Sequence, residues 1–182
     1  MVEKNLADKK IAIIIAFRDF RDEEYFIPKQ VLEEGGAKVI TVSTSQGTAI
    51  GSLGGDTKVD ILLKDLKVSD FDAVVFIGGP GAPKYLDKEE SYRVAKETIS
   101  QNKVLAAICI APAILAKAGV LEGKRATVWS SSMDKSAIKI LEDNKAEYLS
   151  ELVVVDDNIV TGDGPAAAQK FGEKIVEVLT RG

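Results

Sequence analysis

Residues 104–121, VLAAICIAPAILAKAGVL, join a short apolar run directly to a helical pattern. The run VLAAIC (104–109) is continuously apolar, which is typical of a strand buried on both faces. APAILAKAGVLEG (111–123) then predicts a helix that closes near Gly119. Cys109, the only cysteine of the chain, lies between this strand and this helix. The stretch therefore predicts one strand–helix unit of an α/β protein, with a thiol at its turn.

The same alternation extends along the whole chain. Apolar runs that predict further strands lie at 11–17, 37–43, 72–79 and 124–130, with a hairpin-like pair at 152–162. Helical patterns lie at 24–35, 92–102, 133–146 and 166–181. Together they predict a single domain over 1–182, a doubly wound and mostly parallel sheet with helices on both faces. The glycine-rich segment 47–69 predicts a small accessory hairpin beside this sheet.

Composition excludes several classes of protein. The 182 residues are 46% apolar and 29% charged, and their net charge of −4 argues against nucleic-acid binding. One cysteine cannot form an internal disulfide, so nothing points to secretion. The N-terminal apolar run IAIIIAF (11–17) is too short to span a membrane and lacks a small-residue cleavage site. We expect a cytoplasmic protein that binds neither membrane nor nucleic acid.

The chain contains no histidine. Any catalysis must therefore proceed without an imidazole as acid or base, and a zinc site would need carboxylates and a single thiolate. The glycine-rich turn IGGPGAP (77–83) matches neither a P-loop nor a dinucleotide fingerprint. We expect no metal site and no cofactor.

Three segments are expected to meet at the carboxyl ends of the strands: RDFRDEEY (18–25), IGGPGAP (77–83) and CIAP (109–112). A helix start lowers the pKa of a cysteine thiol, although Cys109 is equally interpretable as a small buried apolar residue. The glycine N–H groups in 77–83 can donate hydrogen bonds to an oxyanion that forms during a reaction. Alternatively, the glycines serve only to form a tight loop. Pro28 favours an extended or bent backbone at Ile27, which would place Glu24 over the sheet; otherwise Glu24 is a surface charge.

The combination and order of these pieces resemble the ThiJ/PfpI family, which includes intracellular proteases, glyoxalase-like enzymes and a parkinsonism-associated deglycase. The matching pieces are Glu24-x-x-x-Pro28, DFDAVVFIGGPGAPKYL (70–86), VLAAICIAPAILAKAGVLEGKRAT (104–127) and VVVDDNIVTGDGPAA (153–167). The resemblance implies a flavodoxin-like fold with a nucleophile elbow at Cys109. It also implies a homodimer or a higher homo-oligomer.

The resemblance further implies roles for individual residues. Glu24 would lie beside the sulfur of Cys109, protonated and donating a hydrogen bond to it. The N–H groups of Gly79 and Ile110 would form the oxyanion pocket. Further pocket candidates are Gly78, Pro80, Pro112, Trp129 and Asp163.

The chain departs from the family pattern at three positions. Ile110 stands where protease-like members carry histidine, and Trp129 stands where deglycase-like members carry one. Asp163 replaces the arginine of the late S-R-G-P motif. A Cys–His dyad is therefore excluded, and Glu24 is the only candidate for protonating the amine that peptide hydrolysis releases.

One reaction remains possible without the histidines of the family: a Cys109 thiolate adds to a small reactive carbonyl compound, and Glu24 acts as the proton shuttle. The first alternative is a redox-sensing or protective protein that oxidises at Cys109. Further alternatives are a cysteine peptidase-like protein and a non-catalytic binding protein. Trp129 either fills the crevice and blocks substrate, or lines its wall, or packs in the core.

Overall fold

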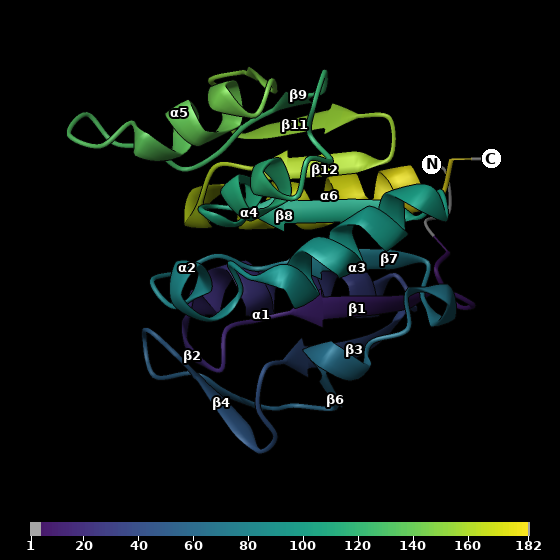
Figure 1. Ribbon diagram of the computed structural model, residues 1–182. Coiled ribbons are helices and arrows are strands. Elements are labelled where there is room, and N and C mark those ends of the chain that lie inside the picture. Colours follow the sequence, from purple (N-terminus) through teal and green to yellow (C-terminus); the bar gives the residue numbers. More distant parts are fainter. Residues whose placement is uncertain (1–4, 182) are drawn as a thin grey trace.

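The centre of the fold is a seven-stranded sheet, seen in a computed structural model that describes residues 5–181 (Figure 1). Its strands, in spatial order, are β11 (Val153–Asp156), β12 (Ile159–Gly162), β8 (Val104–Ile108), β7 (Ala73–Phe76), β1 (Lys10–Ile14), β3 (Lys38–Ser43) and β6 (Ile61–Leu62). All neighbours pair in parallel except β11, which is antiparallel to β12. The predicted doubly wound sheet is confirmed. Residues 1–4 and 182 of the predicted domain lie outside the described residues.

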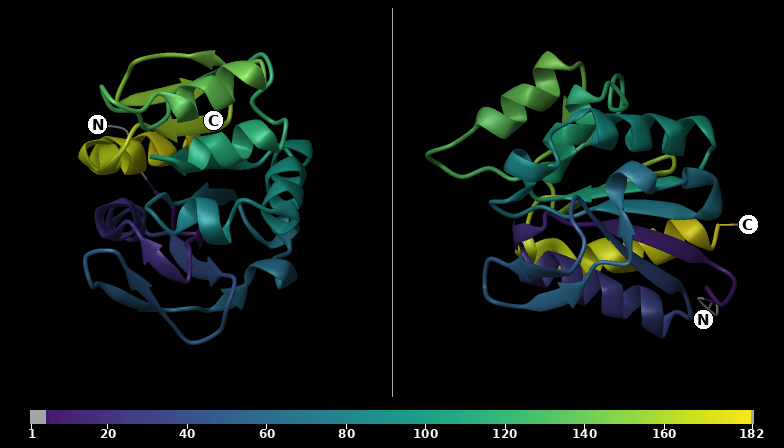
Figure 2. Two further views of the ribbon diagram at one scale, coloured as in Figure 1. Left: turned by 60° about the vertical axis from the view of Figure 1, so that its left-hand side comes forward. Right: turned by 60° about the horizontal axis from the view of Figure 1, so that its bottom comes forward.

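Helices cover both faces of this sheet (Figure 2). On one face α1 (Asp22–Glu34) packs against α6 (Ala168–Leu179), and Gly172 permits the close approach: a β-carbon there would lie 3.1 Å from the β-carbon of Val31. The other face carries α3 (Glu89–Ser100) and α4 (Ala111–Lys117), with the short α2 (Ala82–Tyr85) after β7. None of the helices in the described chain has the length and apolar character needed to cross a membrane.

The central strands β1, β7 and β8 are apolar on both faces because helices cover both faces. From Ile11 to Ile14, from Ala73 to Phe76 and from Leu105 to Ile108, every side chain is completely buried. Burial of this kind supplies most of the free energy that stabilises a fold, at about 25 cal/mol per Å² of apolar surface. The position of the three strand ends is therefore rigidly fixed.

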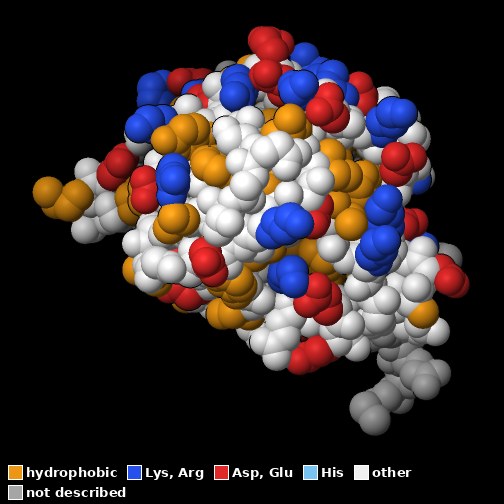
Figure 3. Space-filling view, turned by 90° about the horizontal axis from the view of Figure 1, so that it is seen from below, with side chains coloured by type: hydrophobic (Ala, Val, Ile, Leu, Met, Phe, Trp, Pro, Cys, Tyr) orange, Lys and Arg blue, Asp and Glu red, His pale blue; other side chains and the backbone are white. Residues whose placement is uncertain are grey.

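A smaller three-stranded sheet lies beside the main one and contains β2 (Arg18–Phe20), β4 (Thr48–Gly51) and β5 (Asp56–Lys58). The antiparallel pair β4–β5 is the accessory hairpin that the sequence predicts. The carboxylate of Asp22 accepts hydrogen bonds from the N–H groups of Leu53 (2.8 Å) and Gly55 (2.7 Å), which ties the hairpin turn to α1. The view from below shows separate apolar patches bordered by charged side chains (Figure 3).

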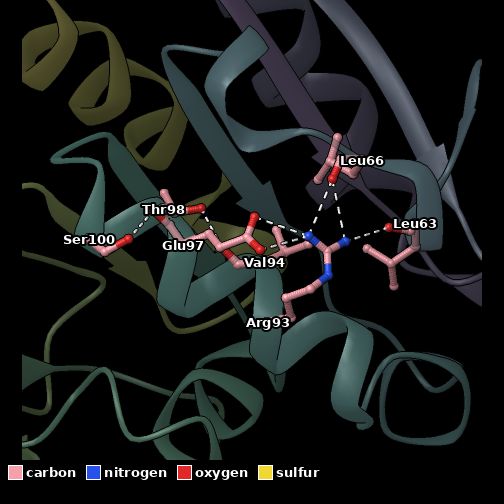
Figure 4. Close-up of polar contacts among 7 residues, drawn as sticks. All are labelled: Leu63, Leu66, Arg93, Val94, Glu97, Thr98 and Ser100. Carbon is pink, nitrogen blue, oxygen red and sulfur yellow. Dashed lines mark hydrogen bonds and ion pairs between the residues drawn. The ribbon is translucent and has the colours of Figure 1, made fainter.

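Arg93 of α3 fastens the segment that follows β6 (Figure 4). Its guanidinium donates to the carbonyl oxygens of Leu63, in the 3₁₀ helix Leu63–Asp65, and of Leu66, each at 3.4 Å. The same group is paired with Glu97 one turn along α3, at 3.0 Å. A second 3₁₀ turn, Val68–Asp70, leads into β7.

Two predicted elements differ from the structure. The expected extended backbone at Ile27 is wrong, because α1 begins at Asp22 and continues through Pro28. Pro28 has no N–H, so the helix lacks only the one hydrogen bond that residue 28 would otherwise donate to the carbonyl oxygen of Glu24. The expected strand 124–130 is reduced to β9 (Arg125–Ala126), because the next N–H, of Thr127, donates to the hydroxyl oxygen of Thr161 instead of a strand neighbour.

The predicted helix 133–146 is also shorter, and forms α5 (Ser136–Asp143). The carboxylate of Asp134 accepts the N–H of Ser136 at 2.9 Å and so fixes the turn that begins the helix. β10 (Glu147–Tyr148) follows and pairs in parallel with β9.

Strand order determines where a site can form. The chain leaves β1 toward β3 on one side, while β7 pairs with β1 on the other side. Such a reversal opens a crevice at the carboxyl ends of the two strands. The segments that follow β1, β7 and β8 all begin there.

Candidate active site

Cys109 occupies a strained turn between β8 and α4. Its backbone φ is 63°, a left-handed conformation that costs a residue with a side chain about 1–2 kcal/mol. Two hydrogen bonds hold this turn: the Cys109 N–H donates to the carbonyl of Gly162 (2.9 Å), and the Trp129 N–H donates to the carbonyl of Cys109 (2.8 Å). A strained residue on a sharp strand-to-helix turn is the geometry of a nucleophile elbow. Cys109 is a half-buried residue.

Glu24 lies beside this turn. It is in the first turn of α1, and its side chain is completely buried. Its Oε2 accepts the N–H of Gly78 at 3.0 Å. Its other carboxyl oxygen, Oε1, has no hydrogen-bonded nitrogen or oxygen partner among the described residues. An unpartnered buried oxygen is costly, and the carboxyl group as a whole interacts with the thiol of Cys109.

Two glycines allow α1 and the elbow to approach each other. A β-carbon on Gly78 would lie 2.6 Å from that of Cys109 and 2.8 Å from Oε2 of Glu24. Gly79 has φ 101°, and a β-carbon there would lie 2.4 Å from the backbone nitrogen of Arg21. The backbone N–H groups of Gly79 and Ile110 lie near the sulfur and act to lower the pKa of the thiol. Only glycine at both positions lets the 77–83 loop pass this close.

Gly78→Ala is expected to lower the free energy of unfolding by about 1–3 kcal/mol, the usual cost of overpacking a close contact. The added methyl group would also push the thiol away from Glu24. Urea unfolding measures the first effect, and the rate of Cys109 alkylation measures the second. Gly164→Ala is the matched control, because a β-carbon there makes only an ordinary 3.7 Å contact with Trp129. Equal stability of the two variants would contradict the expectation.

The pKa values of Glu24 and Cys109 both depart from their ordinary range. Burial raises the pKa of Glu24 to about 7, against smaller lowering effects from Cys109, Gly78 and Arg21. Burial also raises the pKa of the Cys109 thiol, and the charge of Glu24 raises it further. The lowering expected from the helix start is therefore wrong in direction: the N–H groups of Gly79 and Ile110 do lower the thiol pKa, but burial outweighs them.

The two groups consequently titrate as a unit. Above about pH 7 the pair retains one proton, and the raised pKa of the thiol places this proton mainly on the sulfur. A proton on Glu24 removes the carboxylate charge that opposes thiolate formation and leaves an O–H that can donate to sulfur. Transfer of the remaining proton from sulfur to Glu24 would therefore form a thiolate.

The sulfur opens into a cavity of about 310 Å³. The residues that line it are Arg21, Glu24, Gly79, Pro80, Pro83, Cys109, Ile110, Trp129 and Pro165. Trp129 is therefore part of the wall of an open cavity and does not fill it.

A comparison with protein-family models matches residues 9–178 to the DJ-1/PfpI family. The chain belongs to the DJ-1/PfpI family. An uncharacterized protein of Methanocaldococcus jannaschii is 38% identical over 98% of this chain and 86% of its own length. A ThiJ/PfpI domain protein from Brachyspira murdochii has a similar structure, with a TM-score of 0.88 and 35% identity over 93% of this chain and 95% of its own. The flavodoxin-like fold expected from the sequence is confirmed by this structural similarity.

Two further relatives carry names that indicate an activity. The glutathione-independent glyoxalase DJR-1.2 of Caenorhabditis elegans is 29% identical over 95% of this chain and 90% of its own. The deglycase PH1704 of Pyrococcus horikoshii is 30% identical over 92% of this chain and 98% of its own.

The structure of this DJ-1/PfpI protein places the other predicted pocket residues unequally. Pro80 and Trp129 line the cavity, and Gly78 lies behind it as the donor to Glu24. Pro112 is buried within α4 and is not part of the lining. Asp163 is not part of the lining either; its N–H donates to the carbonyl of Leu152, and partial burial raises the pKa of its carboxyl.

Three lining residues are absent from the sequence-based prediction: Arg21, Pro83 and Pro165. Arg21 belongs to the unusual segment 18–25, which the sequence does single out. Pro83 belongs to the glycine-rich turn 77–83. Pro165 begins the 3₁₀ helix Pro165–Ala167, directly after the departure at Asp163. Within residues 5–181, no three His, Cys, Asp or Glu side chains are grouped to hold a metal ion.

Proposed function

We propose that this DJ-1/PfpI protein acts on small reactive carbonyl compounds, 2-oxoaldehydes in particular, through Cys109 and Glu24. The main support for this proposal is the position of the Cys109 thiol, which lies at a strained turn in the wall of an open cavity. Beside it is the completely buried carboxyl group of Glu24, with a pKa of about 7. A general acid–base group works best when its pKa lies near the working pH. The names of the glyoxalase and deglycase relatives support the same class of reaction.

In the first step the sulfur attacks the aldehyde carbon of the substrate. A carbon–sulfur bond forms, and the π electrons of the carbonyl move to its oxygen. Glu24 takes the proton of the thiol and gives it to this oxygen, so that the product is a hemithioacetal and the pair gains no net charge. The N–H groups of Gly79 and Ile110 stabilise the negative charge that develops on the oxygen.

The next steps use the same carboxyl group. The carboxylate of Glu24 removes the proton from the carbon bonded to sulfur, and the former ketone oxygen takes the negative charge, which gives an enediolate. Glu24 returns the proton to the adjacent carbon, and the hydroxyl proton passes from the first oxygen to the second, which gives a thioester with a hydroxyl group beside it. Water then cleaves the thioester, releasing a 2-hydroxy acid and restoring the thiol. The whole reaction adds one water to the 2-oxoaldehyde and needs neither histidine nor an external oxidant.

The wild-type protein is expected to convert methylglyoxal into lactate, and Cys109→Ala to reduce lactate formation to the uncatalysed rate. Glu24→Gln removes the group that moves the proton and is expected to lower kcat. Lactate is measured directly, because loss of methylglyoxal alone also reports its reaction with arginine and lysine. Met133→Ala, at a side chain that is 94% exposed, is the control and should not affect the rate.

Lack of lactate formation by the wild type, or its persistence in Cys109→Ala, would refute the proposal. A redox-sensing protein gives a different result: no lactate, together with rapid oxidation of Cys109 by stoichiometric peroxide. Mass spectrometry of the intact chain distinguishes the two outcomes.

A further inference from the structure

The cavity at Cys109 is large for a substrate as small as methylglyoxal. Its volume of about 310 Å³ falls at the lower end of the range for small-molecule sites, about 300–1,000 Å³. At about 30 Å³ per water molecule, it has room for about ten waters. A methyl substituent would leave most of this volume to water or empty.

Apart from Arg21, Glu24, Gly79 and Cys109, the lining of the cavity is apolar. This apolar wall is formed by Pro80, Pro83, Ile110, Trp129 and Pro165. Arg21 is the one cationic residue in the lining, and its guanidinium is bound by the carboxylate of Glu23 through two contacts, at 2.9 and 3.2 Å. An anionic ligand would therefore have to compete with the carboxylate of Glu23 for Arg21, whereas an apolar group would meet five apolar side chains.

Trp129 is held in place at this wall. Its N–H donates to the carbonyl of Cys109 at 2.8 Å, so its backbone is fixed to the elbow itself. Its indole ring lies against Gly164, with Cδ1 3.7 Å from the position of a β-carbon there. The neighbouring prolines have almost no rotamer freedom to lose, so the wall needs little ordering when a ligand binds.

We propose that the site selects 2-oxoaldehydes with an aryl or large apolar substituent over methylglyoxal, and that Trp129 determines this specificity. The inference rests on the proposed function for the identity of the reacting carbonyl. The apolar subsite itself is a property of the cavity and can be tested without turnover. The substituent lies against the indole and the prolines while the carbonyl lies at Cys109.

Two alkylating agents with the same reactive carbon test the subsite. N-phenyl-2-iodoacetamide carries an aryl group, and 2-iodoacetamide does not. The rate of Cys109 alkylation by the aryl reagent is divided by the rate with 2-iodoacetamide, and this ratio is divided by the same ratio for free glutathione. The result measures binding of the aryl group near the sulfur. We expect at least a tenfold preference in the wild type, equivalent to about 1.4 kcal/mol. Intact-mass measurement is unambiguous because Cys109 is the only cysteine.

Variants at Trp129 test the assignment of the residue. Trp129→Ala is expected to lower the preference to below about threefold, while Trp129→Phe, which retains an aromatic ring, keeps most of it. Met133→Ala is the control and should retain the wild-type ratio. A wild-type ratio equal to that of glutathione would overturn the proposal, as would an unchanged ratio in Trp129→Ala. Should Trp129→Ala fail to fold, Trp129→Leu, which fills part of the same volume without an aromatic ring, takes its place, with the same expected loss of the preference and the same contrary outcome.

Turnover separates this inference from the proposed function. We expect phenylglyoxal to be converted into mandelate with a kcat/KM at least tenfold above that for methylglyoxal. Equal or better conversion of methylglyoxal would overturn the inference and leave the proposed function standing. Absence of turnover with both aldehydes would overturn the proposed function and with it the substrate preference, whereas the alkylation ratio would still show whether the aryl subsite exists.

Discussion

Alkylation of Cys109 is expected to level off above about pH 7 in the wild type and to keep rising in Glu24→Gln. In the wild type the thiol and the buried carboxyl lose their first proton at about pH 7, the pKa of Glu24. Below this pH the thiolate fraction rises tenfold per pH unit, and the rate rises with it. Above it, burial and the carboxylate of Glu24 oppose a second ionisation, so the thiolate fraction stays constant.

The glutamine variant has no ionisation near pH 7. Its thiol titrates alone, and burial, the largest cause of the raised thiol pKa, remains. Its rate should therefore rise about a hundredfold between pH 7 and 9, while the wild-type rate stays within about twofold over this interval. The measurement is the pseudo-first-order rate with 2-iodoacetamide from pH 5.5 to 9.

Glu23→Gln is the matched control for this experiment. Glu23 is partly exposed and pairs with Arg21, and its charge has the smallest effect on the pKa of Glu24. Its variant should keep the bend near pH 7. A wild-type rate that rises without a break to pH 9 would show that the thiol and Glu24 are not coupled. A bend near pH 7 in Glu24→Gln would assign that ionisation to another group.

The arrangement of the main chain around the site follows from the sequence pattern. Continuous apolar runs at 11–17, 72–79 and 104–109 identify strands covered on both faces, and parallel strands end at one edge of a sheet. The segments after them must then meet there. The structure brings Glu24, Gly79 and Cys109 together in this way.

The sequence pattern does not predict how deeply the side chains of Glu24 and Cys109 are buried. A helix start after Cys109 is visible in the sequence and favours a lower thiol pKa. The complete burial of Glu24, and the charge that it places beside sulfur, depend on how the start of α1 packs against the turns that follow β7 and β8. The direction of the thiol pKa is therefore decided by tertiary packing.

Long-range backbone bonds explain the other differences. The segment 124–130 has the apolar content of a strand, but Thr127 and Trp129 donate their N–H groups to Thr161 and Cys109. Both acceptors are supplied by distant parts of the chain, and they turn Trp129 toward the cavity. Whether Trp129 blocks or lines the crevice was therefore not readable from the sequence. Arg21, Pro83 and Pro165 enter the lining because the fold brings their segments to the same edge of the sheet.

Glu24→Gln is also expected to stabilise the folded chain at alkaline pH, by about 3 kcal/mol at pH 8. The folded-state pKa of Glu24 is about 7, against an ordinary value of 4.5, so the folded chain binds this proton more tightly than the unfolded chain. Below pH 4.5 both states are protonated and Glu24 carries no penalty. Between pH 4.5 and 7 the penalty grows by about 1.4 kcal/mol per pH unit, and above pH 7 it is constant. Glutamine has a similar shape and no charge to bury, so the variant escapes the penalty.

Urea unfolding at pH 4.5, 6 and 8 measures this difference, with the fluorescence of the single tryptophan as signal. The gain of Glu24→Gln over the wild type should increase through the series, while Glu23→Gln, at a partly exposed side chain, should change by less than about 0.5 kcal/mol throughout. A gain that does not vary with pH would mean that Glu24 titrates normally in the folded chain. A gain in the free energy of unfolding that is confined to high pH would show that the buried Glu24 carboxylate destabilises the folded chain. Such a loss of stability is expected of a catalytic residue and not of a residue that serves only in packing.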